Sequence, residues 1–121
     1  IPQDLHAALD YADAIACGAA AATAESTGAR VATAALALTV GGLSAVTDYR
    51  LSVAKLVPIE VHEVGDYVFG AMAIAAPFAL RFLRRDKAAA AICIACGAAT
   101  ILGSLFTDYR AARGVGRGWG Q

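Results

Sequence analysis

The sequence has 121 residues, of which 59% are apolar and 17% are charged, and its formal net charge is zero. Its mean hydropathy of +0.59 lies above that of soluble domains, and the zero net charge excludes nucleic-acid binding driven by bulk electrostatic attraction. The charges are clustered, with none in residues 31–46 or 88–106. A helix over 88–106 would be about 28 Å long, close to the hydrocarbon thickness of a membrane. The composition therefore predicts one integral membrane domain over residues 1–121.

The first half of the chain predicts a helical hairpin. A helix is expected over residues 2–24, because Pro2 suits the first helical position and Asp4 favours the positive end of the helix dipole. The polar stretch 25–28 predicts a turn, and a second helix is expected over 29–47.

Two motifs occur twice, which indicates an internal repeat. The pattern P-x-[DE]-x-H-x-x-x-D-Y starts at Pro2 and again at Pro58, 56 residues later. The pattern S-x-x-T-D-Y-R starts at Ser44 and again at Ser104, 60 residues later. The second copy therefore contains four extra residues, which we place in its hairpin loop.

The second half predicts another helical hairpin. Helices are expected over 58–83 and 87–107, with the extra residues around 81–87. Pro77 is expected to kink the first of these helices in the middle of its span, because proline removes a backbone hydrogen bond. The glycine-rich end, 113–121, is predicted to be a mobile tail.

Together these elements predict an all-α fold, a bundle of four transmembrane helices built from two tandem hairpins. Repeat 1 covers 1–56 and repeat 2 covers 57–121. Because each copy has two spans, both enter the membrane in the same sense, as a parallel repeat. The starts of the first and third helices and the ends of the second and fourth then share one membrane face, which gathers the repeated polar residues. These are His6, Asp10, His62 and Asp66, supported by Asp48, Tyr49, Arg50, Asp108, Tyr109 and Arg110.

The basic residues suggest an orientation. Lys and Arg are equally numerous at the two faces, but those between Arg81 and Lys87 are concentrated in one short loop. Positively charged loops favour the cytoplasmic side, so we expect the His/Asp face and both termini outside.

The layout resembles the SPW-repeat family of small bacterial multi-pass membrane proteins. That family is named for Ser-Pro-Trp, and the matching stretch here is Ala76-Pro77-Phe78, while the first copy has Ala20-Ala21-Ala22 at the same register. The resemblance implies a protein of the bacterial cytoplasmic membrane, without an assigned reaction.

One hypothesis for the repeated polar residues is a metal site. His6 and Asp10, like His62 and Asp66, are four residues apart on a helix, so each pair can share a divalent ion, and two facing pairs supply four ligands. In a variant of this hypothesis the two histidines are axial ligands of a haem. The haem variant is the weaker one, because both histidines lie about one turn into their helices and much of the porphyrin would protrude.

The favoured interpretation is a non-enzymatic accessory or assembly subunit, or a self-assembling bundle, whose partners are the lipid bilayer and other membrane subunits or further copies of itself. His6 and Asp10 lie at headgroup depth, where polar residues cost little, and Asp48 could accept from a helix start or pair with Arg50. A third hypothesis is ion or proton transport, because ionisable residues within membrane spans are costly and usually functional. Small residues are expected to let the helices pack closely. They are Gly18, Gly41, Gly42, Gly70, Gly97 and Gly103, with Cys17, Cys93 and Cys96 as buried packing residues.

Overall fold

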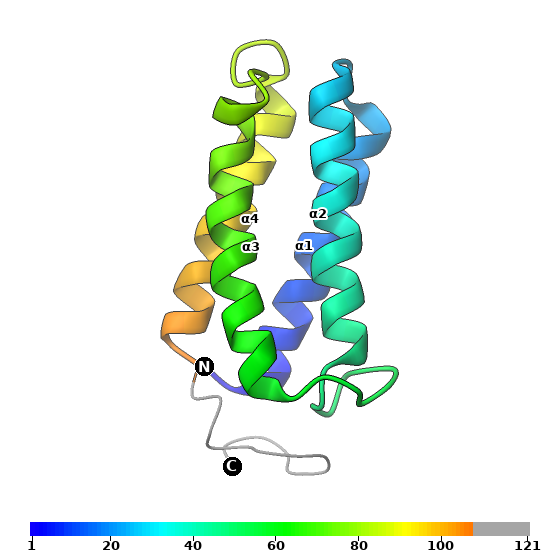
Figure 1. The fold of residues 1–121 in the computed structure, drawn as a ribbon, viewed down its shortest axis with the longest axis vertical. Helices are drawn as coiled ribbons and strands as arrows, with labels where there is room; N and C mark the ends of the chain where they lie inside the picture. The colour runs from blue at the N-terminus through cyan, green and yellow to red at the C-terminus, as the bar shows by residue number, and fades with distance from the viewer. Residues whose placement is uncertain (108–121) are drawn as a thin grey trace.

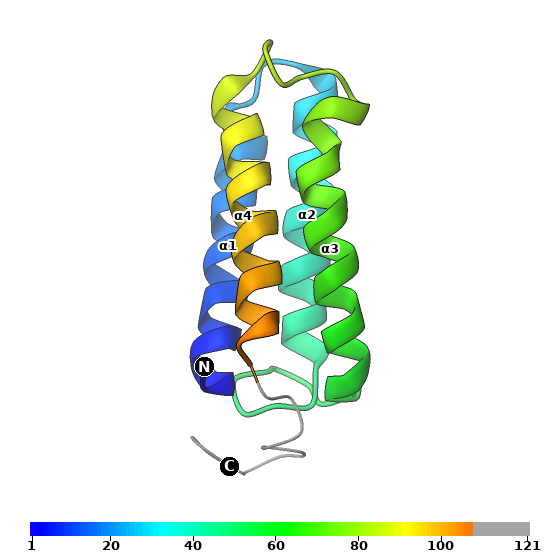
Figure 2. The ribbon, with the colours of Figure 1, turned by 90° about the vertical axis from the view of Figure 1, so that its left-hand side faces the viewer.

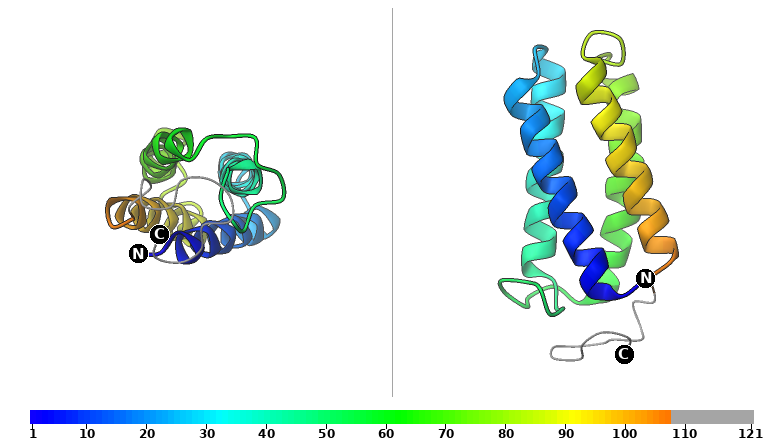
Figure 3. Two further views of the ribbon diagram at one scale, coloured as in Figure 1. Left: turned by 90° about the horizontal axis from the view of Figure 1, so that it is seen from below. Right: turned by 180° about the vertical axis from the view of Figure 1, so that it is seen from behind.

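The computed structural model describes residues 1–107, and the regular elements in this part of the chain are four α-helices. They are α1 (Gln3–Thr23), α2 (Thr27–Val46), α3 (Ile59–Ala79) and α4 (Lys87–Leu105). The most extensive contacts join α1 to α2 and α3 to α4, so the chain folds as two antiparallel hairpins that lie side by side (Figure 1). Seen from below, the helices surround a common centre, with α1 next to α4 and α2 next to α3 (Figure 3).

The helix starts follow the expected local signals. Pro2 and Pro58 immediately precede α1 and α3, and each of these helices has an acidic residue in its first turn. The N-terminus of α2 is capped by Ser26, whose hydroxyl accepts a hydrogen bond from the Ala29 N–H at 3.3 Å. The helix starts therefore lie within two residues of those predicted from the sequence.

The prediction of a kink in the middle of the third helix was wrong. Pro77 lies in the last turn of α3, which ends at Ala79 rather than near residue 83. After that point the N–H groups of Phe82 and Leu83 both donate to the carbonyl of Pro77, at 3.0 and 3.1 Å, and Arg81 adopts a positive φ of 57°. Proline thus contributes to ending the helix, and a longer connection follows.

The two hairpin connections lie together at one end of the bundle (Figure 2). The α1–α2 connection covers residues 24–26, whereas the α3–α4 connection covers 80–86. The four additional residues of the second half are therefore in this connection. The α2–α3 connection and the N-terminus lie at the opposite end, close to the ends of α2 and α4 (Figure 1).

The interior combines small apolar residues along most of the bundle with polar residues near one end. The main apolar core includes Cys17, Ala29, Ala73 and Cys93, each without solvent exposure. All three cysteines are unpaired and buried, in keeping with their predicted role in packing. At the end where α1 and α3 begin, by contrast, the buried residues include His6, Asp10, His62 and Asp66.

The outer faces of all four helices carry large apolar side chains. On α3, Val61, Val64, Val68 and Met72 repeat at helical spacing and are each more than half exposed. Within residues 1–107, α2 and α4 are long and apolar enough to cross a membrane, while α1 and α3 do not meet that criterion. The polar residues of α1 and α3 account for the difference, because they lower the average hydropathy of helices whose exposed surfaces are apolar.

The backbones of α3 and α4 approach each other closely at Gly70 and Gly97. A Cβ atom added to Gly97 would lie 2.7 Å from the carbonyl oxygen of Gly70, and one added to Gly70 would lie 2.9 Å from that of Gly97. Gly18 and Gly42, in contrast, face open space, so these two do not provide the close packing expected of them.

Gly97→Ala is expected to lower the free energy of unfolding by about 1–3 kcal/mol, because the new methyl group must push two backbones apart. Gly18→Ala is the matched control and should be neutral or stabilising by up to about 1 kcal/mol, since alanine is the better helix former. Denaturant unfolding in mild detergent measures both changes, and equal effects at the two positions would contradict the close contact.

Asp86 joins the two hairpin connections. Its Oδ2 accepts hydrogen bonds from the N–H groups of Ser26 and Glu25, at 2.9 and 3.0 Å, and from the Ser26 hydroxyl at 3.1 Å. The hydrogen bond from the Ser26 backbone is the main cause that holds the pKa of this carboxyl below its ordinary value. A carboxyl whose pKa is lower in the folded state stabilises the protein above its unfolded pKa, and this contribution is lost as the pH falls through the folded pKa.

Asp86→Asn is therefore expected to reduce thermal stability at neutral pH. The difference between the wild type and the variant should shrink as the pH falls below the ordinary carboxyl range, because the wild-type group then loses its charge too. Melting curves of both proteins at pH 7 and at acidic pH measure this, and a difference that is independent of pH would argue against a role for the charge.

Candidate metal centre

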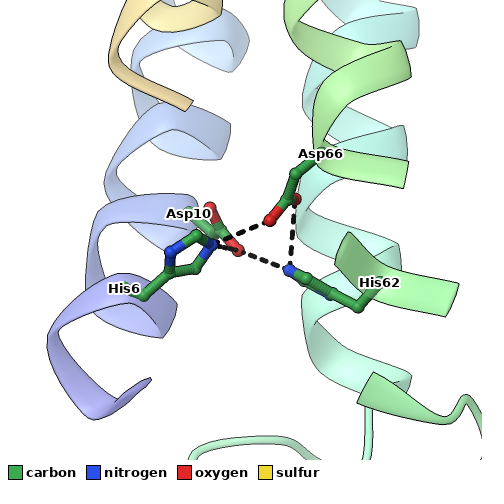
Figure 4. A group of neighbouring side chains, drawn as sticks. All are labelled: His6, Asp10, His62 and Asp66. Carbon is green, nitrogen blue, oxygen red and sulfur yellow. Dashed lines mark hydrogen bonds and ion pairs between the residues drawn. The ribbon is translucent and has the colours of Figure 1, made fainter. Parts of the chain in front are cut away.

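Four side chains from two helices converge near the start of α1 and α3. His6 and Asp10 come from α1, and His62 and Asp66 come from α3 (Figure 4). One ligating atom from each residue can be chosen so that all four lie within 4.8 Å of one another, and all four residues are buried. The structure thus brings together the four residues singled out in the sequence, in a group that could hold a metal ion.

The shortest contacts cross between the two helices. His6 Nε2 lies 2.8 Å from Asp66 Oδ2, and His62 Nε2 lies 3.0 Å from Asp10 Oδ2. The contacts within one helix are longer, at 3.6 Å for His6 Nε2 to Asp10 Oδ2 and 3.2 Å for His62 Nε2 to Asp66 Oδ1. The i,i+4 spacing places the His and Asp of each copy on the same face of one helix. In the structure, however, each imidazole lies closest to the carboxylate from the other hairpin.

Two threonines fix the orientation of the imidazole rings. His62 Nδ1 lies 2.7 Å from the hydroxyl of Thr47, and His6 Nδ1 lies 3.0 Å from that of Thr107. Each hydroxyl donates its own proton to the backbone carbonyl four residues earlier, at 2.6 Å for Thr47 and 2.7 Å for Thr107. A hydroxyl has only one proton, so each threonine must accept from the imidazole. Both Nδ1 atoms therefore carry hydrogen, and both Nε2 atoms face the carboxylates.

Two serines hold the carboxylates in place by donating hydrogen bonds to them. The Ser44 hydroxyl donates to Asp10 Oδ2 at 3.0 Å, and the Ser104 hydroxyl donates to Asp66 Oδ2 at 3.1 Å. All four hydroxyl partners come from the repeated motif S-x-x-T-D-Y-R, at or beside the ends of α2 and α4. From the sequence, only the Asp, Tyr and Arg of this motif were predicted to support the site. The recurrence of Ser and Thr at equal spacing was the signal that could have found them.

The predicted supporting residues that the structure describes lie around the cluster rather than among the four candidate ligands. Tyr49 packs against His62 with 5.4 Å between ring centroids, and burial raises the pKa of its phenol. Arg50 pairs with Asp4 rather than with Asp48, whose backbone N–H donates to the carbonyl of Val57 at 2.8 Å. The remaining predicted members, Asp108, Tyr109 and Arg110, lie outside the described residues.

The donor set matches what a divalent transition metal requires. With Nδ1 protonated, each Nε2 of a neutral imidazole directs a lone pair at carboxylate oxygens, a repulsive arrangement that either protons or a cation must relieve. The four contacts between a histidine Nε2 and a carboxylate oxygen, from 2.8 to 3.6 Å, are close to the edge of about 3.3 Å expected for a tetrahedron with metal–ligand bonds of about 2.0–2.1 Å. With one atom taken from each residue the separations reach up to 4.8 Å, so the longest edges must shorten by as much as about 1.5 Å when an ion binds.

A haem does not fit between the two histidines. Each Nε2 lies 3.0 Å or less from a carboxylate oxygen of the opposite helix, so the carboxylates occupy the space that a porphyrin would need. The haem variant of the metal hypothesis therefore has no support from this geometry.

A scan of protein-family models and searches of curated proteins and of solved structures found no match to this chain. The resemblance to the SPW-repeat family therefore stays a prediction.

Proposed function

We propose that this protein binds one divalent transition metal ion, zinc foremost, through His6, Asp10, His62 and Asp66. The observation that carries the proposal is the pair of Thr–His hydrogen bonds, because they fix both imidazoles in the tautomer that ligates through Nε2. Histidines that bind metals usually donate their other N–H to a protein acceptor in this way. The serine and threonine partners can keep all of their hydrogen bonds when an ion is present.

Charge favours a divalent ion. Two neutral imidazoles and two carboxylates carry a charge of minus two, which a divalent cation neutralises inside a buried site. Burying net charge is costly, so monovalent and trivalent ions fit less well. Mixed nitrogen and oxygen ligands in a tetrahedral arrangement favour zinc over magnesium or calcium, which prefer oxygen ligands alone and higher coordination numbers.

We also propose that all four helices span a membrane, as two tandem hairpins that enter in the same sense. The support is the distribution of polarity, since His6, Asp10, His62 and Asp66 of α1 and α3 turn inward while large apolar residues cover most of the outside. Ile15 on α1 is 73% exposed and Leu38 on α2 is 77% exposed. Exposed apolar surface of this extent is typical of contact with lipid.

Within this architecture the ion would tie the first hairpin to the second, because each hairpin supplies two of its four ligands. This role suits a non-enzymatic accessory or assembly subunit, whose partners would be other membrane subunits or further copies of the same chain. Ion or proton transport stays an alternative prediction.

The metal proposal is tested with protein purified in detergent without chelators. Elemental analysis should find close to one zinc per chain, and metal-free protein reloaded with cobalt(II) should show the visible absorption of a nitrogen- and oxygen-ligated ion. Excess magnesium or calcium should not displace it. A chain that binds neither zinc nor cobalt at stoichiometric level would refute the proposal.

The membrane arrangement predicts the accessibility of two loop positions. Single cysteines at Ser52 and Arg84, introduced after the three native cysteines are replaced with alanine, should react with an impermeant reagent from opposite sides of the membrane. We expect the basic loop that contains Arg84 to face the cytoplasm. Labelling of both positions from the same side, or release of the protein by alkaline washing, would be incompatible with four spans.

A further inference from the structure

A small cavity adjoins the candidate metal centre on the side of α1 and α4. It lies between α1 and α4, has a volume of about 30 Å³, and its polar lining consists of His6, Asp10, Asp13 and Thr100. A space of this size can hold one or two water molecules. Leu9, Ala99 and Gly103 make most of its exposed lining apolar, and the polar side chains lie at its edge. Asp13 and Thr100 are joined to each other, since the Thr100 hydroxyl donates to Asp13 Oδ2 at 2.9 Å.

At the interface between α2 and α3, the positions that correspond to Asp13 and Thr100 are apolar. By the sequence offsets of 56 and 60, Phe69 is the counterpart of Asp13, and Val40 is the counterpart of Thr100. Both are buried, at 4% and 2% exposure. The groove that runs between α2 and α3 is lined almost entirely by apolar residues, and none of the four proposed ligands belongs to its lining.

A second pair of positions also differs between the α1–α4 side and the α2–α3 side. On the α1–α4 side, Leu9 and Gly103 both line the small cavity. On the α2–α3 side the sizes are reversed, because the counterparts are Gly65 and Leu43, and a Cβ added to Gly65 would lie 2.7 Å from Leu43 Cδ2. Leu43 therefore fills the space over Gly65. The four ligands are duplicated, but their surroundings differ: a small space with Asp13 and Thr100 in its lining remains on the α1–α4 side, whereas Leu43 packs over Gly65 on the α2–α3 side.

We propose that the cavity beside Asp13 holds a water molecule that serves as an exchangeable fifth ligand of the metal, so that the centre is open towards α1 and α4 and closed towards α2 and α3. The proposal rests on the metal-binding function proposed above. At the far wall the Asp13 carboxylate and the Thr100 hydroxyl oxygen can both accept hydrogen bonds from this water, because the Thr100 proton is already donated to Asp13. The lone pair of the water oxygen is then available to the cation. Ligand exchange and metal loading would proceed through this position.

The main test variant gives the α1–α4 side the residues that occupy the equivalent positions on the α2–α3 side. Asp13→Phe/Thr100→Val reproduces the Phe69 and Val40 pair and should fill the cavity while all four ligands remain. We expect it to bind one cobalt(II) ion with a more intense visible absorption, as four-coordinate cobalt has, and to release the ion to a chelator at least about tenfold more slowly than the wild type. Val40→Thr, on the closed side, is the matched control and should leave both properties unchanged.

A second variant keeps the test valid if the double variant does not fold. Asp13→Asn preserves the size of the side chain but removes its negative charge, so azide should perturb the cobalt spectrum at a concentration about tenfold lower than in the wild type, because a like charge no longer repels the anion. If the cobalt-loaded variants had the same spectra, release rates and azide response as the wild type, the proposed fifth ligand would be refuted. The metal-binding function would not be affected. Failure of the wild-type chain to take up cobalt would instead overturn the metal-binding function and this inference with it.

Discussion

His6→Ala/His62→Ala is expected to abolish stoichiometric metal binding and to lower the free energy of unfolding by about 3–5 kcal/mol, the range found when a buried charge loses its partner. The reason is that Asp10 and Asp66 would remain buried, at 2% and 1% exposure, with both imidazoles gone. Ser44 and Ser104 would still donate to the carboxylates, but neither hydroxyl supplies positive charge.

Two measurements separate the effects of this double variant. Elemental analysis reports the loss of metal, and denaturant unfolding of metal-free wild type and metal-free variant reports the cost of the unpaired carboxylates. Asp48→Asn is a suitable control, because Asp48 is a half-buried carboxyl at the same end of the bundle. If the double variant retained its metal, ligation through the histidines would be refuted.

Thr47→Val and Thr107→Val are each expected to weaken zinc binding by about 10–100-fold, as is usual when a hydrogen-bond partner of a metal ligand is removed. Valine has nearly the shape of threonine but cannot accept the proton of Nδ1. The imidazole is then free to adopt the other tautomer or to rotate, and Nε2 is no longer held towards the carboxylates. The two variants should behave alike, because the two threonines make equivalent contacts.

Thr33→Val is the matched control for these variants. Thr33 is also buried on α2, and its hydroxyl donates to the carbonyl four residues earlier at 2.7 Å. It lies outside the centre, so zinc affinity measured by competition with a chelator should not change. Equal weakening in Thr33→Val and Thr47→Val would show that the loss comes from the helix rather than from the imidazole.

The centre illustrates where sequence reasoning succeeded and where it did not. His6 and His62 were found because they recur with Asp10 and Asp66 at helical spacing, a local pattern that a repeat makes visible. The partners of the imidazole rings were missed, although Thr47 and Thr107 recur just as regularly. Threonine is common at helix ends for local reasons, so only the short distances to Nδ1 distinguish these two from the rest.

The role of Asp13 could not be deduced from spacing. In the sequence Asp13 follows Asp10 by three residues and has Phe69 as its counterpart in the second copy, but nothing there links it to Thr100. Their contact depends on how α1 lies against α4, two helices whose contacting residues are 87 positions apart. The same holds for the cavity, which exists because the small residue Gly103 faces α1 at that level.

The sequence by itself determined the number of helices, their approximate bounds and the end of the bundle at which the polar residues gather, because these follow from apolar run lengths, proline positions and the repeat. Only the tertiary structure decided which carboxylate each histidine contacts, which tautomer it adopts and which side of the centre has space. Those features depend on helix rotation and on contacts between residues 52 to 60 positions apart, which local propensity does not specify.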